Sequence, residues 1–330
     1  MKAFVTGGTG FLGTHLIEAL TAKEWEIVAL RRPTSDVSRF TGMRNVRFAT
    51  GDVTDIDSLR AAMPDDVDAV FHVAGSAAML PHNLEYTRYR INHHGTRYTA
   101  KVAIEKGARR FIHTSTIGTF DWKGPQPLTE HSGPNTWSKD IYIRSKALAD
   151  AEIARAIGQG LDAVFMHPCA LVGRYDTDTW SKAFKEIERG LPFPFAPPGA
   201  INVCHVPAVA DAFIAAFHTA PSGEHYILGG PQIDYLDMFQ RIARLLNKKG
   251  PRRAVPATVF TALGYTEFAV STALRREPTL TPHTVALLKD RVDADSSKAI
   301  AELGYETVDV DIPLRDCYEW MAATGLVSVK

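Results

Sequence analysis

The feature that most constrains the fold is a glycine-rich segment at residues 6–13, Thr-Gly-Gly-Thr-Gly-Phe-Leu-Gly. Its spaced glycines are Gly7, Gly10 and Gly13. An apolar run at residues 3–6 precedes it and an amphipathic pattern at 14–23 follows it, as between a strand and a helix. At such a turn the backbone can approach a pyrophosphate, and the helix amino terminus offers unpaired N–H groups. The segment therefore predicts a dinucleotide site rather than a plain tight turn.

Apolar runs and helical patterns alternate through the first half of the chain. The runs that we expect to be strands are 3–6, 27–30, 46–49, 69–74, 110–114 and 163–166. The helical patterns are 14–23, about 84–106 and 141–157. Near-continuous apolar runs are typical of buried parallel strands, and strand–helix–strand repetition gives a sheet covered on both faces. The sequence predicts an α/β fold with a Rossmann-type, doubly wound parallel sheet.

The alternation breaks after residue 168. A loop rich in Pro and Gly covers 190–199, a strand-like run follows at 202–206, and the chain becomes mostly helical from 235. A helix at 207–218 and a strand at 225–228 can return to the sheet. We therefore expect a dinucleotide-binding domain at 1–168, with 207–228 returning to it. Residues 169–206 and 229–330 are expected to form a smaller, mostly helical, substrate-binding lobe.

Composition excludes several classes of partner. Lys+Arg and Asp+Glu are equal at 37 each, with no run of like charge, so nucleic acid and anionic membranes are not expected partners. The three cysteines are widely spaced, which argues against a disulfide framework or a zinc site and favours the cytoplasm. No secretory signal or membrane-spanning apolar stretch is expected. The adjacent His93 and His94 face different directions on a helix, so no metal is expected either.

The ends of the expected strands carry candidate cofactor contacts. Arg31 and Arg32 stand where an acidic residue would accept the ribose hydroxyls of NAD, and two guanidiniums there suit a 2′-phosphate. The alternative is that Arg31 and Arg32 are simply two solvated side chains at the end of a strand. Asp52 and Val53 can lie beside the adenine, and small residues at 74–75 suit a backbone that faces a flat ligand.

A candidate catalytic group follows. Tyr142 and Lys146 are four residues apart, so they share one face of the expected helix. A nearby ammonium favours the phenolate and lowers the pKa of a tyrosine. Residues 114–116, Thr-Ser-Thr, end the fifth strand at the carboxyl edge, where parallel sheets bind ligands. Ser115 and Thr116 are both candidates to hold a substrate carbonyl. The alternative is that each hydroxyl only forms hydrogen bonds with nearby backbone groups.

With these motifs the sequence resembles the extended and intermediate short-chain dehydrogenase/reductases, the NAD-dependent epimerase/dehydratase superfamily. The ordered motifs are TGGTGFLG, GDVTD, HVAG, FIHTST, LTE and YIRSK, with Pro168 after the sixth strand. Within the superfamily the chain is most similar to dihydroflavonol-reductase-like bacterial ketone or aldehyde reductases. That likeness lies in Arg31-Arg-Pro33 and in residues 295–305. The segments at 174–177 and 207–208 depart from the family pattern, so the resemblance implies no specific substrate.

The resemblance implies roles for individual residues. It selects Thr116 over Ser115 as the catalytic hydroxyl, and it implies that Asn92 supports Lys146 through water. It also implies that the backbone at 168–172 grips the nicotinamide carboxamide. The expected cofactor contacts are Gly7, Thr9, Gly10, Phe11, Leu12, Gly13, Arg31, Arg32, Asp52, Val53, Ala74, Gly75, Thr114, Tyr142, Lys146, Pro168, Ala170 and Leu171.

The expected function is reduction of a ketone or aldehyde, or the reverse oxidation, with NADP(H) in preference to NAD(H). Tyr142 donates the proton, Lys146 lowers its pKa and binds the ribose, and Thr116 orients the carbonyl. One alternative is a nucleotide-sugar epimerase or dehydratase with tightly bound NAD, and another is a cofactor-sensing protein without turnover. The resemblance also implies a homodimer through the helices at 84–106 and 141–157. Aromatic residues that flank the cleft, Trp122 among them, suit either an apolar substrate pocket or packing.

Overall fold

The computed structural model describes residues 1–76, 85–190, 195–274, 276, 280 and 282–328. Its main element is a seven-stranded sheet with the order β10-β6-β5-β4-β1-β2-β3, in which every pairing is parallel. The strands are β1 Lys2–Thr6, β2 Glu26–Arg31, β3 Val46–Thr50, β4 Ala69–His72, β5 Arg110–Thr114, β6 Ala163–Pro168 and β10 His225–Leu228. The chain reverses its direction of winding between β1 and β4, which is where doubly wound sheets bind ligands. The expected Rossmann-type sheet is confirmed.

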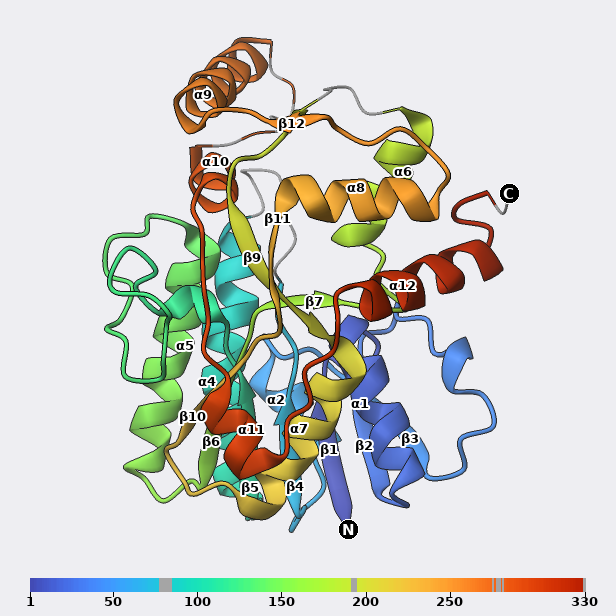
Figure 1. Ribbon diagram of the computed structural model, residues 1–330. Coiled ribbons are helices and arrows are strands. Elements are labelled where there is room, and N and C mark those ends of the chain that lie inside the picture. The colour runs from blue at the N-terminus through green and yellow to red at the C-terminus, as the bar shows by residue number, and fades with distance from the viewer. Residues whose placement is uncertain (77–84, 191–194, 275, 277–279, 281, 329–330) are drawn as a thin grey trace.

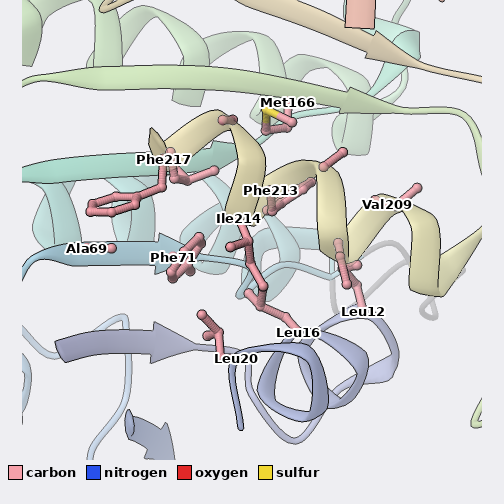
Figure 2. Close-up of a cluster of buried hydrophobic side chains, with 14 of the residues drawn as sticks. Leu12, Leu16, Leu20, Ala69, Phe71, Met166, Val209, Phe213, Ile214 and Phe217 are labelled. Atoms are coloured by element: carbon pink, nitrogen blue, oxygen red, sulfur yellow. The ribbon is translucent and has the colours of Figure 1, made fainter. Parts of the chain in front are cut away.

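Helices cover both faces of this sheet (Figure 1). On one face α1 (Phe11–Ala22) packs beside α7 (Val206–Thr219). Figure 2 shows their apolar side chains meeting those of β4 and β6. The labelled members of this cluster are Leu12, Leu16, Leu20, Ala69, Phe71, Met166, Val209, Phe213, Ile214 and Phe217. Burial of these side chains holds the glycine-rich turn before α1 against the sheet.

The opposite face is covered by α2 (Ile56–Ala62), α4 (Gly95–Glu105) and α5 (Ile141–Ile157), which share a second apolar cluster with the sheet. The helix expected at about 84–106 is continuous over its described part, but one turn of it is π-helical rather than α-helical. It runs as α3 (Glu85–Tyr89), a π-helical turn (Arg90–His94) and then α4. A π-turn inserts an extra residue and often marks a functional site. Here the turn contains Asn92.

Most of the remaining chain lies beyond the carboxyl ends of the parallel strands, at the top of Figure 1. A three-stranded sheet joins this region to the main one, and its strands are β7 (Ala170–Val172), β9 (Ala200–His205) and β11 (Gln232–Asp234). A short parallel pair, β8 and β12, lies farther out. The bounds of that pair and of the helices of this region are β8 Phe195–Ala196, β12 Arg253–Ala254, α6 Trp180–Arg189, α8 Tyr235–Leu245, α9 Ala257–Ala273, α10 Pro282–Lys289 and α12 Asp311–Ala323. The mostly helical character expected from residue 235 onward is confirmed.

One late helix returns to the main sheet. The helix α11 (Ser297–Leu303) packs against α7 and β10, near the bottom of Figure 1. The Tyr226 hydroxyl of β10 donates to Glu302 Oε2 at 2.7 Å and fixes this contact. Within the described residues, no helix combines the length and apolar character that crossing a membrane requires.

Candidate active site

The glycine-rich turn is tight enough to require its glycines. Gly7 has φ +70°, a left-handed conformation that other residues rarely adopt. A Cβ on Gly7 would lie 2.6 Å from the backbone N of Ala74, so β1 and β4 approach closely at the point where the winding reverses. A Cβ on Gly13 would lie 2.1 Å from the Gly7 carbonyl oxygen, which no side chain can tolerate. Because the Gly10 N–H donates to that same oxygen at 3.0 Å, the turn is closed by its own backbone.

The amino terminus of α1 is open to an anion. Gly10 is the N-cap residue and has no side chain to cap the helix, and the first turn contains no acidic residue. The backbone N–H groups of this turn and the positive end of the helix dipole suit a phosphate. Of the other residues expected to contact the cofactor here, Thr9 and Phe11 are half-buried and Leu12 belongs to the core. This geometry fits the pyrophosphate of a dinucleotide.

The ends of β2 and β3 lie beside this turn in the sheet order. Arg31 is half-buried at the end of β2 and Arg32 is exposed just after it. Within the described chain, no ion pair engages either guanidinium. Asp52 follows β3, and one of its carboxylate oxygens, Oδ1, accepts from the backbone N–H and the hydroxyl of Thr54, each at 2.8 Å. Val53 is buried against Gly95 of α4, where a Cβ would lie 2.9 Å from its methyl group.

Lys146 lies at the centre of the site. Its Nζ donates to the carbonyl oxygen of Thr114 at 2.7 Å, and the side chain is 4% exposed. A Cβ on Gly75 would lie 3.3 Å from this ammonium, so the exposed backbone after β4 faces it directly. Burial lowers the pKa of Lys146 to about 8, against the opposing effect of the Asp150 carboxylate. The ends of β4 and β5 and the face of α5 therefore meet at one cation.

Asn92 contacts the same backbone segment, close to Lys146. Its side-chain oxygen accepts from the N–H of Ser76 at 2.8 Å, and its amide donates to the Ser76 carbonyl at 3.2 Å. The amide also donates to the Ser145 hydroxyl at 3.0 Å. A Cβ on Gly75 would lie 3.4 Å from the Asn92 oxygen, as well as close to Lys146. The π-turn thus aims Asn92 at the segment that faces the ammonium.

Tyr142 lies one helical turn before Lys146, near the start of α5. This start is fixed by Asp140, whose carboxylate accepts from the Ile143 N–H at 2.9 Å as the N-cap. Burial raises the pKa of Tyr142, and the nearby Thr116 hydroxyl opposes the rise. The structure therefore places Tyr142 near Thr116, and burial raises the pKa of the phenol, where the sequence analysis expected Lys146 to lower it.

The neighbouring hydroxyls of Ser115 and Thr116 have different partners. Ser115 is 3% exposed, and its hydroxyl donates to Asp150 Oδ2 at 2.7 Å. The other oxygen of that carboxylate lies 3.0 Å from His113 Nε2, so Ser115 belongs to a buried polar group beneath the site. The Thr116 hydroxyl accepts only weakly from the Gly118 N–H, at 3.3 Å. Its proximity to Tyr142 and its partial exposure make Thr116 the better placed of the two for a substrate.

The remaining expected contacts lie at the ends of β6 and β7. Pro168 is buried as the last residue of β6, and Ala170 and Leu171 are half-buried at the start of β7. His167 also lies here, and its Nδ1 is 3.2 Å from the Thr116 carbonyl oxygen. Sequence reasoning did not identify this support for Thr116, because a histidine in an apolar strand resembles an ordinary core residue.

A second group that sequence reasoning missed joins the lobe to α1. The Arg174 guanidinium and the Tyr175 hydroxyl both donate to Glu18 of α1, each at 2.8 Å. His15 lies 3.0 Å from the Arg174 carbonyl oxygen, and burial lowers the pKa of His15 to about 4. The residues at 174–177, which depart from the family pattern, thus connect the lobe to the helix of the glycine-rich turn. No local motif in the sequence signals these long-range pairs.

His93 and His94 form no metal site in the part of the chain that the structure describes. The two nitrogens of His93 lie 2.8 Å from the Tyr89 hydroxyl and 3.2 Å from Glu152. All three cysteines are free thiols.

Comparisons with known proteins match the whole of this architecture. The family model described as the NAD dependent epimerase/dehydratase family matches residues 3–229. The sterol demethylase protein B of Methylococcus capsulatus is 26% identical over 332 residues, which cover 99% of this chain and 100% of that protein. The 4-hydroxy-2-methyl-3-oxo-4-farnesyl-3,4-dihydroquinoline-1-oxide ketoreductase of Stigmatella aurantiaca is 27% identical over 316 residues, or 92% of each chain. The crystal structure of gox2253 is 27% identical, with a TM-score of 0.86 and coverage of 99% of both chains.

Proposed function

Since the chain belongs to the NAD dependent epimerase/dehydratase family, we propose that it is an NADP(H)-dependent oxidoreductase that acts on a carbonyl group. The reaction is reduction of a ketone or aldehyde to an alcohol, or its reverse. The observation that carries this proposal is the meeting of Thr116, Tyr142 and Lys146 at the carboxyl edge of the sheet. Similarity to a ketoreductase over most of the chain supports it.

Each residue has a chemical task in this proposal. When bound, the nicotinamide ring supplies or accepts a hydride at the substrate carbon. Thr116 and Tyr142 hold the carbonyl oxygen between two hydroxyls, and the Tyr142 phenol donates its proton to that oxygen as negative charge develops. The Lys146 ammonium binds the nicotinamide ribose and stabilises the phenolate that remains. Asn92 is a positioning residue in this scheme, because it orients the backbone after β4 toward Lys146.

The preference for NADP(H) is proposed from Arg31 and Arg32. Both guanidiniums lack a carboxylate partner among the described residues, and such forked donors suit a 2′-phosphate. We expect the double substitution R31A/R32A to raise the KM for NADPH at least tenfold while changing the KM for NADH little. Steady-state kinetics with both cofactors measure this, and R189A, at the exposed end of α6, is the matched control. Equal losses with NADPH and NADH would refute the assignment.

The second candidate is a nucleotide-sugar epimerase or dehydratase, which the family description also includes. Such an enzyme returns the hydride within one turnover, so its NAD stays bound and is not consumed. Release of the cofactor on denaturation, with no net change in absorbance during catalysis, would favour it. Net oxidation of NADPH by a ketone or aldehyde supports the first candidate.

We also propose a homodimer in the cytoplasm. The outer faces of α3 and α5 carry large exposed apolar side chains, Tyr86 at 67% and Leu148 at 40% exposure. These helices contact each other, so the two side chains can belong to one continuous surface. Light scattering of the purified chain measures the expected mass of two subunits, and L148E should lower it to one.

A further inference from the structure

Asp150 and Lys146 lie one helical turn apart on α5. Because residues four apart share a helix face, both side chains project toward the end of β5. Lys146 Nζ donates to the carbonyl oxygen of Thr114 at 2.7 Å, and Asp150 Oδ2 accepts from the hydroxyl of Ser115 at 2.7 Å. The ammonium and the carboxylate are thus held at adjacent residues of one segment.

Both hydrogen-bond donors to the Asp150 carboxylate are neutral groups. One is the Ser115 hydroxyl, and the other is His113, whose Nε2 lies 3.0 Å from Oδ1. An ionised carboxylate can only accept, so Nε2 carries the proton of the ring. Burial lowers the pKa of His113 well below its ordinary value, so Nδ1 carries none, and among the described residues this buried atom has no hydrogen-bond partner. The charge of Asp150 is therefore not neutralised by the groups that hold it.

The other titratable groups that face this pair from the sheet are histidines. His72 of β4 interacts with Lys146, and His167 of β6 and His225 of β10 interact with Asp150. Burial lowers the pKa of all three, so their rings are uncharged at neutral and alkaline pH. None of them supplies a cation for Asp150 or an anion for Lys146 in that range.

Two other charged groups near the site act on the Tyr142 phenol instead, Arg88 of α3 and Asp140 at the start of α5. Among the described residues, Asp150 forms no ion pair with a lysine or arginine, and Lys146 forms none with a carboxylate. Burial lowers the pKa of Lys146, and the Asp150 charge opposes this effect. Burial raises the pKa of Asp150, and the Lys146 charge is among the groups that oppose it. Each of the two charges therefore stabilises the other across the site.

We propose that Asp150 is a positioning residue that keeps Lys146 in its ammonium form while the carbonyl is reduced. The inference rests on the proposed function, because the ammonium is the group that binds the ribose and stabilises the Tyr142 phenolate. Ser115 and His113 hold the carboxylate in place. Asp150 then acts on Lys146 through its charge rather than through a hydrogen bond, and it touches neither substrate nor cofactor.

The test is the pH profile of kcat/KM, measured as NADPH oxidation by the best substrate among a series of 2-alkanones and n-alkanals. D150N keeps the shape of the side chain, since its amide can accept from His113 and donate to the Ser115 oxygen. It removes the charge, so the pKa of Lys146 should fall further. We expect the alkaline loss of activity to begin roughly one pH unit lower than in the wild-type protein. At pH 6, where the amine is still protonated, kcat/KM should stay within a few-fold of wild type.

Three further variants separate the charge of Asp150 from its structural contacts. D150E keeps the charge and should return the alkaline loss to its wild-type position. S115A removes a hydrogen bond to the same carboxylate but not its charge, so the profile should not move. E152Q removes a negative charge elsewhere on α5, where the carboxylate pairs with His93 and Arg155, and it too should keep the wild-type profile. If D150N does not fold, D150S is a second neutral variant with the same expected shift.

The outcomes separate this inference from the proposed function. An alkaline loss in D150N at the wild-type pH, or a loss of the same size at every pH, would contradict only the role of Asp150. An equal shift in E152Q would also contradict it, because any acid on α5 would then serve. Absence of NADPH oxidation by the wild-type protein with every carbonyl compound would contradict the proposed function itself, and this inference with it.

Discussion

Ser115 and Thr116 carry the same functional group one residue apart, and their surroundings separate their roles. In extended backbone, as at Thr116 just after β5, successive side chains point to opposite sides. Ser115 points to Asp150 beneath the site, and Thr116 lies near Tyr142 within it. The sequence pattern alone left both residues as candidates, because both hydroxyls lie at the end of the same strand. Only the resemblance to a family distinguished them before the structure did.

Substitution of the two hydroxyls should have different consequences. T116V removes a donor to the developing oxyanion, so we expect kcat to fall about 100-fold or more. S115A removes a buried hydrogen bond to Asp150 and should lower the free energy of unfolding by about 1–2 kcal/mol, while kcat stays within a few-fold. Kinetic assays and urea unfolding of both variants measure this. A larger loss of kcat in S115A than in T116V would reverse the assignment.

The pKa of Lys146 leads to a prediction for the pH dependence of carbonyl reduction. Its pKa is lowered to about 8, so the ammonium loses its proton as the pH rises through that value. The neutral amine no longer stabilises the Tyr142 phenolate, and kcat/KM for reduction should fall above pH 8. In K146R the residual activity should not fall there, because a guanidinium stays charged. A wild-type profile that stays flat to pH 10 would contradict this role.

Among the secondary-structure elements, the strands with long apolar runs were the most predictable. The strands at 110–114 and 225–228 and the helix at 141–157 have the expected bounds. Several features were not anticipated, and two of them lie at the site. The helix α1 begins at Phe11 rather than at 14, directly after the extended N-cap residue Gly10. The π-turn at Arg90–His94 has no sequence signal, since its residues suit an ordinary helix equally well.

The glycine-rich turn before α1 should lose cofactor affinity when Gly13 gains a side chain. G13A places a Cβ 2.1 Å from the Gly7 carbonyl oxygen, which forces the turn to open. We expect cofactor affinity to fall more than tenfold, with some loss of stability, because the backbone N–H groups move away from the phosphates. Titration with NADPH, followed by protein fluorescence, measures the affinity. G133A is the matched control, because nothing lies within 4 Å of its added Cβ, and an equal effect of both substitutions would contradict the account.

At the scale of the whole molecule, contacts between distant segments hold the lobe over the sheet. The ion pair of Arg174 with Glu18 joins the lobe to α1, and the pair of Arg174 with Asp316 of α12 lies within the lobe. His15 lies under these pairs as a buried, neutral imidazole. Such pairs could not be predicted, because the sequence places their members more than a hundred residues apart and without any repeating pattern.

Buried histidines predict loss of stability in acid. Burial lowers the pKa of His15 and of His167 to about 4, whereas an unfolded histidine titrates near 6.5. Between these values the unfolded chain binds more protons than the native one, so the free energy of unfolding falls as the pH drops from 6.5 to 4. Each histidine contributes up to about 3 kcal/mol to this fall. Urea unfolding at pH 6.5, 5.5 and 4.5 measures it.

The effect of substituting a buried histidine is compared with that of substituting an exposed one. H15Q should show a shallower fall in unfolding free energy than the wild-type protein over the same range. H131Q, at an exposed position, should retain the wild-type slope. If all three proteins lose stability equally, acid denaturation has another origin.

The most direct test of the central claim is the stoichiometry of NADPH oxidation with a ketone or aldehyde. Wild-type protein should form one alcohol for each NADPH consumed, and Y142F should lose this activity by about 100-fold or more while it still binds NADPH. Measuring product and NADPH together, in both proteins, gives the answer. Formation of product without consumption of NADPH, or full activity in Y142F, would contradict the claim.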